Sequence, residues 1–480
     1  MTPSYFLKTI HILFLLLLLP ACFLLAAIKL PYFFADNMVL QQQTDAAIWG
    51  DAKANSSIQI TTSWNKKKYS VQSDAAGKWK TKISTPLAGG PYEISVSDGT
   101  PLVLHNVLIG EVWLCSGQSN MEMPMKGFKD QAVNNSNDAI FNSTNNNIRL
   151  YIVPRSVKLQ AQDTSKSSPW KTADPESVAN FSAAAYYFAK IMQERLHVPV
   201  GLINISYGGS SAEAWMSGTL LQSFSDIILP TSKDSAKANN RTPTTLYNGM
   251  LHPFIGFTIK GCLWYQGESN YDRPDQYATL FPAMVKEWRD EFQQGDFPFY
   301  FVQIAPFNYA QSPPYNSGGK YNSAYLRDVQ RKVVSKISNS GMVVLLDAGD
   351  ENTIHPANKE IVGKRFAYLA LAKTYGMKGF GYTSPSYDSL KINGNVATIK
   401  FMDAGNGLTS FGKALSNFEI AGADKIFHPA KAVIARGTVI VSSPEVTTPV
   451  AVRYAFRDFV VGDLFSTEGF PVSSFRTDDW

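Results

Sequence analysis

The pattern of hydrophobic and polar positions changes twice along this chain. Between about residues 28 and 107, short runs of alternating apolar and polar side chains are separated by turn-forming residues. Examples are the runs 47–49, 57–62 and 92–96, with turn residues at 74–77 and 89–91. Alternation with a period of two places successive side chains on opposite faces of a strand. Short strands with frequent Gly, Pro and Asp turns predict a small β-sandwich over residues 28–107.

From about residue 108 to 376, apolar runs alternate with segments of helical periodicity. The expected strands are 107–114, 200–206, 259–265, 299–304 and 342–346, and the expected helices are 183–196, 276–292, 324–337 and 359–375. Such alternation predicts an α/β unit, a mostly parallel sheet with helices on both faces. After Gly376 short strands return, for instance 397–401 and 438–441. We therefore expect a C-terminal β-rich, sandwich-like unit over residues 377–480.

The first 27 residues follow neither pattern. Lys8 precedes an apolar run at 12–27 that is broken by Pro20 and ends in small residues. This pattern is typical of a secretory signal peptide, and the short run with an internal proline disfavours a membrane span. Residues 19–22, Leu-Pro-Ala-Cys, also resemble a bacterial lipoprotein signal, which would place a lipid anchor on Cys22. We therefore predict export to a periplasmic, extracellular or lysosome-like location, with the lipoprotein as the alternative.

Composition narrows the classes of partner. A chain of 480 residues with 45% hydrophobic residues is long enough for two or three domains, each with its own core. The net charge of +5 is small, and the densest basic run, at 66–68, lies in a strand-like stretch, so no nucleic-acid partner is expected. Cys115 and Cys262 fall in apolar runs and are expected to be buried thiols. No Cys/His cluster has metal-ligand spacing and no Gly-rich phosphate loop occurs, so we expect neither metal nor cofactor.

Residues with catalytic chemistry follow the expected strands of the α/β unit. Loops that leave the C-terminal ends of parallel strands converge on one edge of the sheet. Four segments leave such ends: 115–121 (Cys-Ser-Gly-Gln-Ser-Asn-Met), 207–215 (Tyr-Gly-Gly-Ser-Ser-Ala-Glu-Ala-Trp), 266–270 (Gln-Gly-Glu-Ser-Asn) and 347–356, which ends in His-Pro. A serine, a histidine, acidic residues and Gly-rich backbone are thus expected to meet at one rim. These are the components of acyl transfer.

Ser119 and His355 are the expected nucleophile and base. A serine hydroxyl needs an imidazole to take its proton and hydrogen-bond donors to hold the oxyanion that forms. Ser116 precedes the turn and is the lesser candidate. Of the six histidines, the others fall in the leader, in the β-rich units, at a helix end or, for His252, before the third strand. The alternative for His355 is a structural residue that caps the following helix.

These blocks resemble the sialate O-acetylesterase family, a branch of the SGNH-type hydrolases. The family has a Gly-Gln-Ser-Asn-Met block, a Gly-rich block, a Gln-Gly-Glu-Ser-Asn or -Asp block and a late Ile-His-Pro block in this order, as here at 117–121, 207–211, 266–270 and 354–356. The resemblance extends to Asn-Met-Val-Leu-Gln at 37–41 and Phe-Arg-Thr-Asp-Asp-Trp at 475–480. It implies an SGNH-hydrolase-like sheet flanked by the two β-rich units, and a serine esterase that removes acetyl groups from sialic acid through an acyl-enzyme.

Carried onto this sequence, the family pattern assigns the remaining roles. Ser119 becomes the nucleophile, and His355 becomes the general base and later the acid that protonates the leaving sugar oxygen. The expected oxyanion donors are the backbone N–H of Ser119, an N–H from Gly208 or Gly209, and a side-chain amide. SGNH enzymes generally take that amide from an asparagine in the third block. Here Asn270 or Gln266 could supply it.

The third member of the triad departs from the family pattern. Most SGNH hydrolases place an aspartate three residues before the histidine, but Asn352 stands there and carries no charge. The substitutes are Glu268 from the third block, Asp350 or Glu351 from the same loop, or a backbone carbonyl such as that of Thr353. Glu268 ranks slightly above Asp350, because related carbohydrate acetylesterases use their Gln-Gly-Glu block in the site.

Substrate recognition has three candidate side chains. Trp215 and Tyr271 could stack on a sugar face, and Arg273 could meet the carboxylate of sialic acid; core packing and a loop salt bridge are the alternatives. The expected partner is O-acetylated sialic acid or another acetylated carbohydrate. Deacetylation of xylan or another polysaccharide would use the same site chemistry. A third hypothesis, favoured by Asn352, is a carbohydrate-binding protein that has lost its activity on an esterase scaffold.

Overall fold

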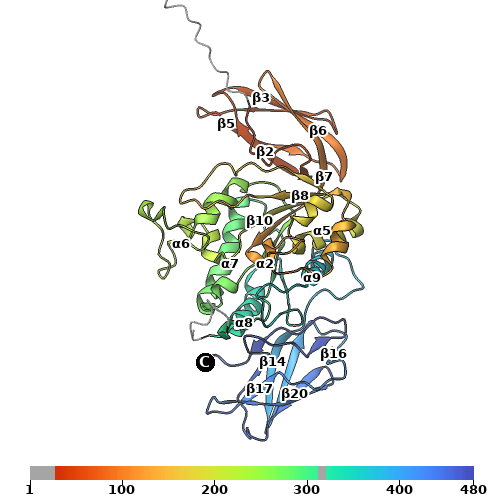
Figure 1. Ribbon diagram of the computed structural model, residues 1–480, viewed down its shortest axis with the longest axis vertical. Coiled ribbons are helices and arrows are strands. Elements are labelled where there is room, and N and C mark those ends of the chain that lie inside the picture. The colour runs from red at the N-terminus through yellow and green to blue at the C-terminus, as the bar shows by residue number, and fades with distance from the viewer. Residues whose placement is uncertain (1–27, 312–320) are drawn as a thin grey trace, which may run out of the picture.

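The computed structural model describes residues 28–311 and 321–480. The predicted signal peptide at 1–27, and Cys22 with it, lie outside these residues. Figure 1 shows three regions along the long axis of the molecule: strands at one end, helices and strands in the middle, and further strands at the other end. None of the helices in the described ranges is long and apolar enough to cross a membrane.

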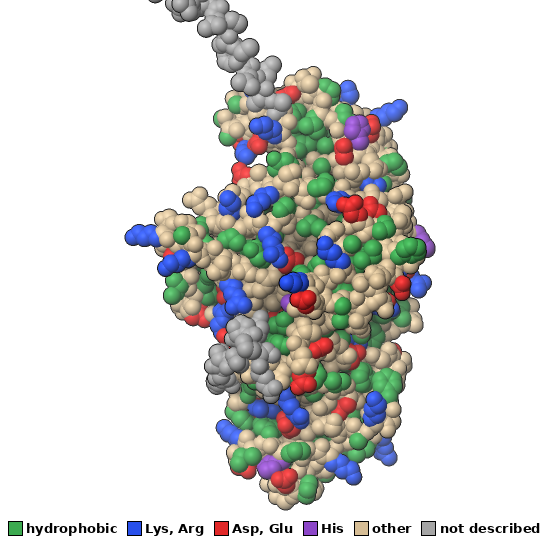
Figure 2. All heavy atoms as spheres, viewed as in Figure 1, with side chains coloured by type: hydrophobic (Ala, Val, Ile, Leu, Met, Phe, Trp, Pro, Cys, Tyr) green, Lys and Arg blue, Asp and Glu red, His purple; other side chains and the backbone are tan. Residues whose placement is uncertain are grey.

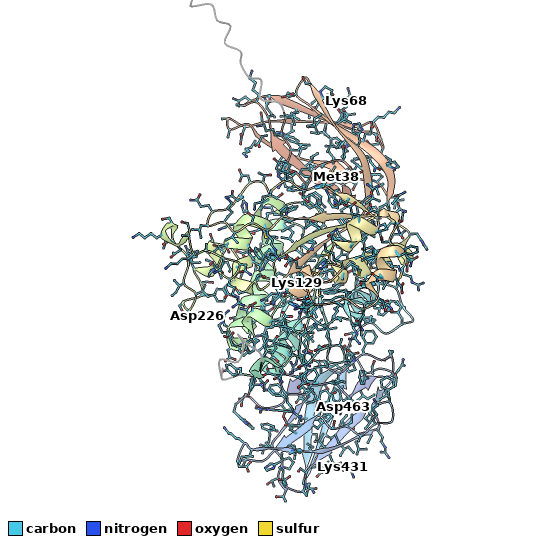
Figure 3. The ribbon with its side chains drawn as sticks, viewed as in Figure 1. Met38, Lys68, Lys129, Asp226, Lys431 and Asp463 are labelled. Atoms are coloured by element: carbon cyan, nitrogen blue, oxygen red, sulfur yellow. The ribbon has the colours of Figure 1, made fainter. Side chains whose placement is uncertain are left out.

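The N-terminal region is made of short, mostly antiparallel strands, as their alternating side chains predict; β1 pairs in parallel with β7. β3 pairs with β4 and β6, and β2 pairs with β5. In β3, Ile58 and Ile60 are buried while Gln59 between them is exposed. Lys68 marks this region in Figure 3. The strands are β1 (Val39–Gln41), β2 (Asp45–Asp51), β3 (Ser57–Thr62), β4 (Lys68–Gln72), β5 (Lys78–Ser84) and β6 (Gly89–Ser97).

One long strand, β7 (Pro101–Gly117), belongs to both the N-terminal region and the middle region. Its first part pairs antiparallel with β6, and its last residues pair in parallel with β10 and β11. The boundary predicted between residues 107 and 108 therefore falls inside a continuous strand. The reason is that alternation gives way to a fully buried run at Val107 with no turn residue between the two patterns.

The middle region is a mostly parallel sheet in the order β13-β12-β11-β7-β10-β8-β9. Only β9, at one edge, runs antiparallel to its neighbour. Gly117, Ser206 and Tyr265, the last residues of β7, β10 and β11, are register partners, so three strands end level with one another. The further strands are β8 (Asn145–Ile152), β9 (Lys171–Ala173), β10 (Val200–Ser206), β11 (Gly261–Tyr265), β12 (Phe299–Val302) and β13 (Ser340–Val343).

Helices cover both faces of this sheet. α5 (Ala183–Leu196) and α9 (Lys359–Lys373) pack on the face that presents Trp113 and Leu263. α7 (Pro274–Phe292) and α8 (Ser323–Val333) pack on the face of Trp264 and Phe301. Shorter elements are α2 (Ser119–Glu122), α3 (Ser136–Phe141), α4 (Pro175–Ala179), α6 (Gly218–Leu221), η1 (Ala212–Trp215), η2 (Ser232–Asp234), η3 (Tyr247–Leu251), η4 (His252–Phe254), η5 (Glu268–Asn270), η6 (Tyr309–Gln311) and η7 (Val334–Lys336).

The C-terminal region packs two four-stranded antiparallel sheets around Ile399, Val441, Tyr454 and Phe475. One of its contacts with the middle region is Arg327 of α8, a fully buried side chain that donates to the carbonyl oxygens of Ala455, Arg457 and Asp458. The strands are β14 (Ser386–Asn393), β15 (Val396–Met402), β16 (Leu408–Thr409), β17 (Phe418–Ala421), β18 (Phe427–Pro429), β19 (Lys431–Ala435), β20 (Thr438–Ser442), β21 (Ala451–Tyr454), β22 (Phe465–Ser466) and β23 (Phe475–Arg476).

Candidate active site

The sharp turn at the end of β7 presents Ser119 at the rim of the sheet. Gly117 has a φ of +134°, and a β-carbon there would lie 2.1 Å from the carbonyl oxygen of Tyr265, so only glycine fits without moving the backbone. The Gln118 N–H donates to the same carbonyl at 2.9 Å. α2 then begins at Ser119. Ser116, by contrast, is fully buried and donates its hydroxyl to the Ile205 carbonyl, so it is not exposed at the rim.

His355 reaches Ser119 from the loop between β13 and α9. Its Nε2 lies 2.7 Å from the Ser119 hydroxyl oxygen, although 236 positions separate the two residues. Its other ring nitrogen, Nδ1, lies 2.6 Å from Oε1 of Gln131. With the ring proton on Nδ1, His355 donates to Gln131 and its Nε2 is free to accept the serine proton. The structure thus brings together the nucleophile and base expected from the sequence and adds a glutamine behind them.

His355 is neutral at physiological pH. Burial, and secondarily the nearby positive charge of Lys359, lower the pKa of His355 to about 4. The Phe128 ring and the imidazole pack in a T-shaped arrangement at a centroid distance of 5.4 Å, so Phe128 contributes an apolar wall. A neutral imidazole is the form that can take a proton from serine.

The structure corrects the expectation for Asp350. Its carboxylate accepts the backbone N–H groups of Asn352 and Thr353, at 2.8 and 3.1 Å, and so closes the turn of its own loop. Neighbouring Glu351 faces Asn308 instead of the imidazole. The carboxylates before His355 therefore shape the loop without contacting the ring.

Glu268 is also not the partner of His355. It is 1% exposed, and its Oε1 accepts from the Asn120 side chain at 2.6 Å. Asn120 in turn donates to the Ile354 carbonyl at 3.0 Å and accepts from Lys359 Nζ at 2.5 Å. We call Asn120, Glu268 and Lys359 the buried network. It ties the nucleophile turn, the third block and the histidine loop together beneath the site.

Burial acts on both charged members of the buried network. It raises the pKa of Glu268 and lowers the pKa of Lys359 to about 7, while the attraction between the two opposes both changes. Glu268 Oε2 meets no donor within the described part of the chain. Ions this deeply buried are stable only while paired, so the network depends on both charges being present or both being absent.

Gln131 had no signal in the sequence. It follows α2 in a loop of turns and isolated β-bridges, not at the end of a parallel strand, and no chemical motif surrounds it. Figure 3 labels Lys129, two residues earlier, near the centre of the middle region. Only the fold shows that this loop returns to the rim where Ser119 lies.

Three of the expected oxyanion donors already donate hydrogen bonds to other groups of the protein. The Gly208 N–H donates to Glu122 Oε2 at 2.7 Å. Gln266 Nε2 donates to the Ser210 carbonyl and to Asn270 Oδ1, at 3.2 and 2.7 Å. The Asn270 amide, fully buried, donates to Glu213 and accepts from the Ala212 N–H. These groups hold the second and third blocks together.

Two backbone N–H groups remain open beside the nucleophile. Within the part of the chain that the structure describes, neither the Ser119 N–H nor the Gly209 N–H meets an acceptor. The turn that contains Gly209 lies against the serine, since a β-carbon on Gly208 would be 3.3 Å from the Ser119 β-carbon. Of the expected oxyanion donors, the N–H groups of Ser119 and Gly209 are therefore the two that no acceptor among the described residues occupies.

Neither Trp215 nor Arg273 has the setting expected of a substrate contact. Trp215 is fully buried, donates to the Ser210 hydroxyl and meets the Trp264 ring edge-on, which makes it a core residue. Arg273 donates to Glu213 at 2.9 Å and to Gln276 at 2.6 Å. Tyr271 is 8% exposed and stacks on Tyr309 at 4.3 Å. Trp215 and Tyr271 are therefore core residues, and Arg273 forms a loop salt bridge, as the alternative interpretations expected.

The remaining candidates for reactive or metal-binding chemistry are inert. Cys115 and Cys262 are free and fully buried, as predicted, and burial raises the pKa of both thiols. In the described ranges, no group of three or more His, Cys, Asp and Glu side chains has the geometry to hold a metal ion.

Comparison with known proteins gives one consistent result. The sequence model of the family described as carbohydrate esterase, sialic acid-specific acetylesterase, matches residues 109–371, which include every residue of the site. The sialate O-acetylesterase of Rattus norvegicus is 30% identical over 412 residues, covering 73% of this chain and 74% of the relative. The corresponding human protein is 28% identical over 385 residues, with 74% and 73% covered.

A solved structure is similar over almost the whole chain. The crystal structure of a carbohydrate acetylesterase from Xanthomonas citri is 35% identical, with a TM-score of 0.85. The similarity covers 94% of this chain and 100% of that one. Both β-rich regions are thus part of the shared architecture.

Proposed function

Because this chain belongs to the carbohydrate esterase family of sialic acid-specific acetylesterases, we propose that it hydrolyses O-acetyl esters on sialic acids through an acyl-enzyme on Ser119. It is a carboxylic ester hydrolase. The observation that carries the proposed mechanism is the 2.7 Å contact between the Ser119 hydroxyl and His355 Nε2. The substrate is taken from the named activity of the curated relatives.

The proposed reaction begins with proton transfer to His355. As Nε2 takes the hydroxyl proton, Ser119 Oγ attacks the acetyl carbonyl carbon, and the oxyanion is held by the N–H groups of Ser119 and Gly209. His355 then gives its proton to the sugar oxygen, which leaves as an alcohol. A water molecule, deprotonated by the same imidazole, releases acetate and restores the serine hydroxyl.

Gln131 orients the base in this scheme. Its Oε1 accepts the Nδ1 proton, which fixes the ring in the tautomer whose Nε2 can act as base. An amide oxygen carries no full charge, so it stabilises the imidazolium of the transition state less than a carboxylate would. We propose a site of the SGNH type in which an amide replaces the usual acid.

Three further proposals concern the whole chain. The first is that the chain has an N-terminal unit at 28–107, a catalytic unit at 108–376 and a C-terminal unit at 377–480. Strand β7 is shared between the first two units. The signal-like segment at 1–27 supports export, and Cys22 within it is a candidate for a lipid anchor. Mass spectrometry of the mature N-terminus distinguishes cleavage near residue 27 from a lipid on Cys22.

Deacetylation of another carbohydrate is the second candidate function. It is favoured by the Xanthomonas citri structure, a carbohydrate acetylesterase that matches both the fold and the length of this chain. The test is release of acetate from O-acetylated sialic acid and from acetylated xylan by the wild type and by Ser119→Ala. Acetate from sialic acid that requires Ser119 supports the first proposal, and acetate from xylan alone supports the second. Release from neither rejects both.

A further inference from the structure

Three arginines surround the loops that carry the active site, and two of them are paired with a carboxylate. Arg155 donates from Nε and Nη2 to the two oxygens of Glu122, both at 2.6 Å. Arg273 donates from Nη2 to Glu213 at 2.9 Å. Arg241 forms no ion pair with any Asp or Glu in the described parts of the chain. Its charge is the one that no neighbouring carboxylate balances.

Arg241 is nevertheless held in place. Its backbone N–H donates to Asn239 Oδ1 at 2.8 Å, and its carbonyl accepts from the Ser211 hydroxyl at 3.1 Å. Its side chain is anchored through Nε, which donates to the Gly209 carbonyl at 3.0 Å. The terminal nitrogens Nη1 and Nη2 donate to none of the described residues, and the residue is exposed. Arg241 thus presents an oriented, unoccupied fork of N–H groups, the geometry that binds a carboxylate through two hydrogen bonds.

The anchor of Arg241 is the turn beside the nucleophile. Gly209, whose carbonyl accepts from Arg241, follows Gly208, where a β-carbon would be 3.3 Å from that of Ser119. The neighbouring Asn240 fixes the same turn by donating to the Gly208 carbonyl at 2.5 Å. The guanidinium is therefore anchored from a different loop onto the turn that offers the Gly209 N–H, one residue beyond the glycine that lies against Ser119.

We propose that Arg241 is a specificity-determining residue that receives the carboxylate of an acidic acetylated sugar. The proposal rests on the esterase function proposed above and deepens it, because it names the group that distinguishes a sialic acid from a neutral sugar. It also replaces Arg273, which the sequence suggested and which Glu213 occupies. Figure 2 shows further Lys and Arg side chains, interspersed with Asp and Glu, across the middle region on the face where Figure 3 labels Lys129.

The test compares two substrates that differ only in the carboxyl group. O-acetylated sialic acid and its carboxamide, in which an amide replaces the carboxylate, are hydrolysed by the wild type and by Arg241→Gln, Arg241→Lys, Arg155→Gln and Arg273→Gln. The readout is the ratio of kcat/KM for the acid to kcat/KM for the carboxamide. Because both values come from the same protein preparation, the fraction of folded enzyme cancels.

The expected results separate the three arginines. Arg241→Gln lowers the ratio by about tenfold to hundredfold, the range of a charge-assisted hydrogen bond, mainly through KM for the acid. Arg241→Lys keeps the charge but loses the fork and falls between Arg241→Gln and the wild type. Arg155→Gln and Arg273→Gln leave the ratio as it is in the wild type, even where they lower both rates.

Two results would overturn the inference while the esterase proposal stands. One is a wild-type ratio near one with acetate release that still requires Ser119. The other is a ratio that Arg241→Gln leaves unchanged or that Arg155→Gln or Arg273→Gln lowers instead. If neither sialic acid derivative yields acetate while acetylated xylan does, the sialate function and the role of Arg241 fail together.

Discussion

Oε1 of Gln131 lies 2.6 Å from Nδ1 of His355, so an uncharged amide occupies the position that an aspartate has in a Ser-His-Asp triad. The carboxylates near His355 in the sequence serve other purposes: Asp350 closes its own loop and Glu268 belongs to the buried network. His355 therefore meets an uncharged partner at Nδ1, and neither of these carboxylates contacts its ring.

Substitution of Gln131 tests this arrangement directly. Gln131→Leu removes the acceptor for the Nδ1 proton, and we expect kcat to fall by about tenfold to ten-thousandfold, up to the loss seen when a base is held in the wrong tautomer. Gln131→Glu supplies a carboxylate, which favours the imidazolium, so the acid limb of the pH profile should move upward by roughly one pH unit or more. Full activity of Gln131→Leu with an unshifted profile would show that this glutamine does not orient the base.

The acid limb of the wild-type profile should lie unusually low. His355 acts as a base only when it is neutral, and its pKa is lowered to about 4 by burial and by Lys359. Activity should thus fall as the pH drops through about 4, whereas a free imidazole would lose its function near 6.5. The measurement is kcat/KM against pH with a neutral aryl acetate, whose own charge does not change. A limb near 6.5 would contradict the low pKa.

The buried network should show strong coupling between its charges. Lys359→Met leaves Glu268 buried without its cation, and we expect it to lower the free energy of unfolding by about 3–5 kcal/mol. The double variant Lys359→Met with Glu268→Gln removes both charges and should recover part of that loss. Urea unfolding of the two single variants and the double variant measures the coupling. Strictly additive losses would mean that the two residues act independently.

Ser119 and Ser116 form a matched pair of serines three residues apart. Ser119→Ala should abolish acetate release, because the attacking oxygen is removed. Ser116→Ala loses one buried hydrogen bond to the Ile205 carbonyl, so it should cost about 1 kcal/mol of stability with activity close to that of the wild type. Ester hydrolysis and thermal unfolding of both variants check this. Loss of activity in Ser116→Ala without unfolding would reopen the choice of nucleophile.

The sequence could predict the strands and the rim because both depend on local pattern. Strands that are buried on both sides are apolar runs, and the loops at their ends contain Ser119 and His355. β8, at Asn145–Ile152, was missed because it begins with three asparagines, residues that favour turns. Gln131 and Arg241 were missed for another reason. Their surroundings come from residues far away in the chain, so no local pattern marks them.

Trp215 and Arg273 support the loops from within instead of facing a substrate, again because of contacts that the local sequence does not show. Both follow strand ends, where functional side chains gather, but such loops also need internal support. Trp215 fills the space beneath the second block, and Arg273 neutralises Glu213, which in turn holds Asn270. A sequence shows which loops reach the rim, while the direction of each side chain depends on the packing behind it.

The continuity of β7 limits how this enzyme can be divided or recombined. The strand begins by pairing with β6 in the N-terminal region and ends at Gly117, two residues before Ser119. A fusion or domain exchange with a junction anywhere within the strand would change the central strand of the catalytic sheet. The N-terminal region and the nucleophile are therefore joined by one continuous strand, so a domain exchange must move them together.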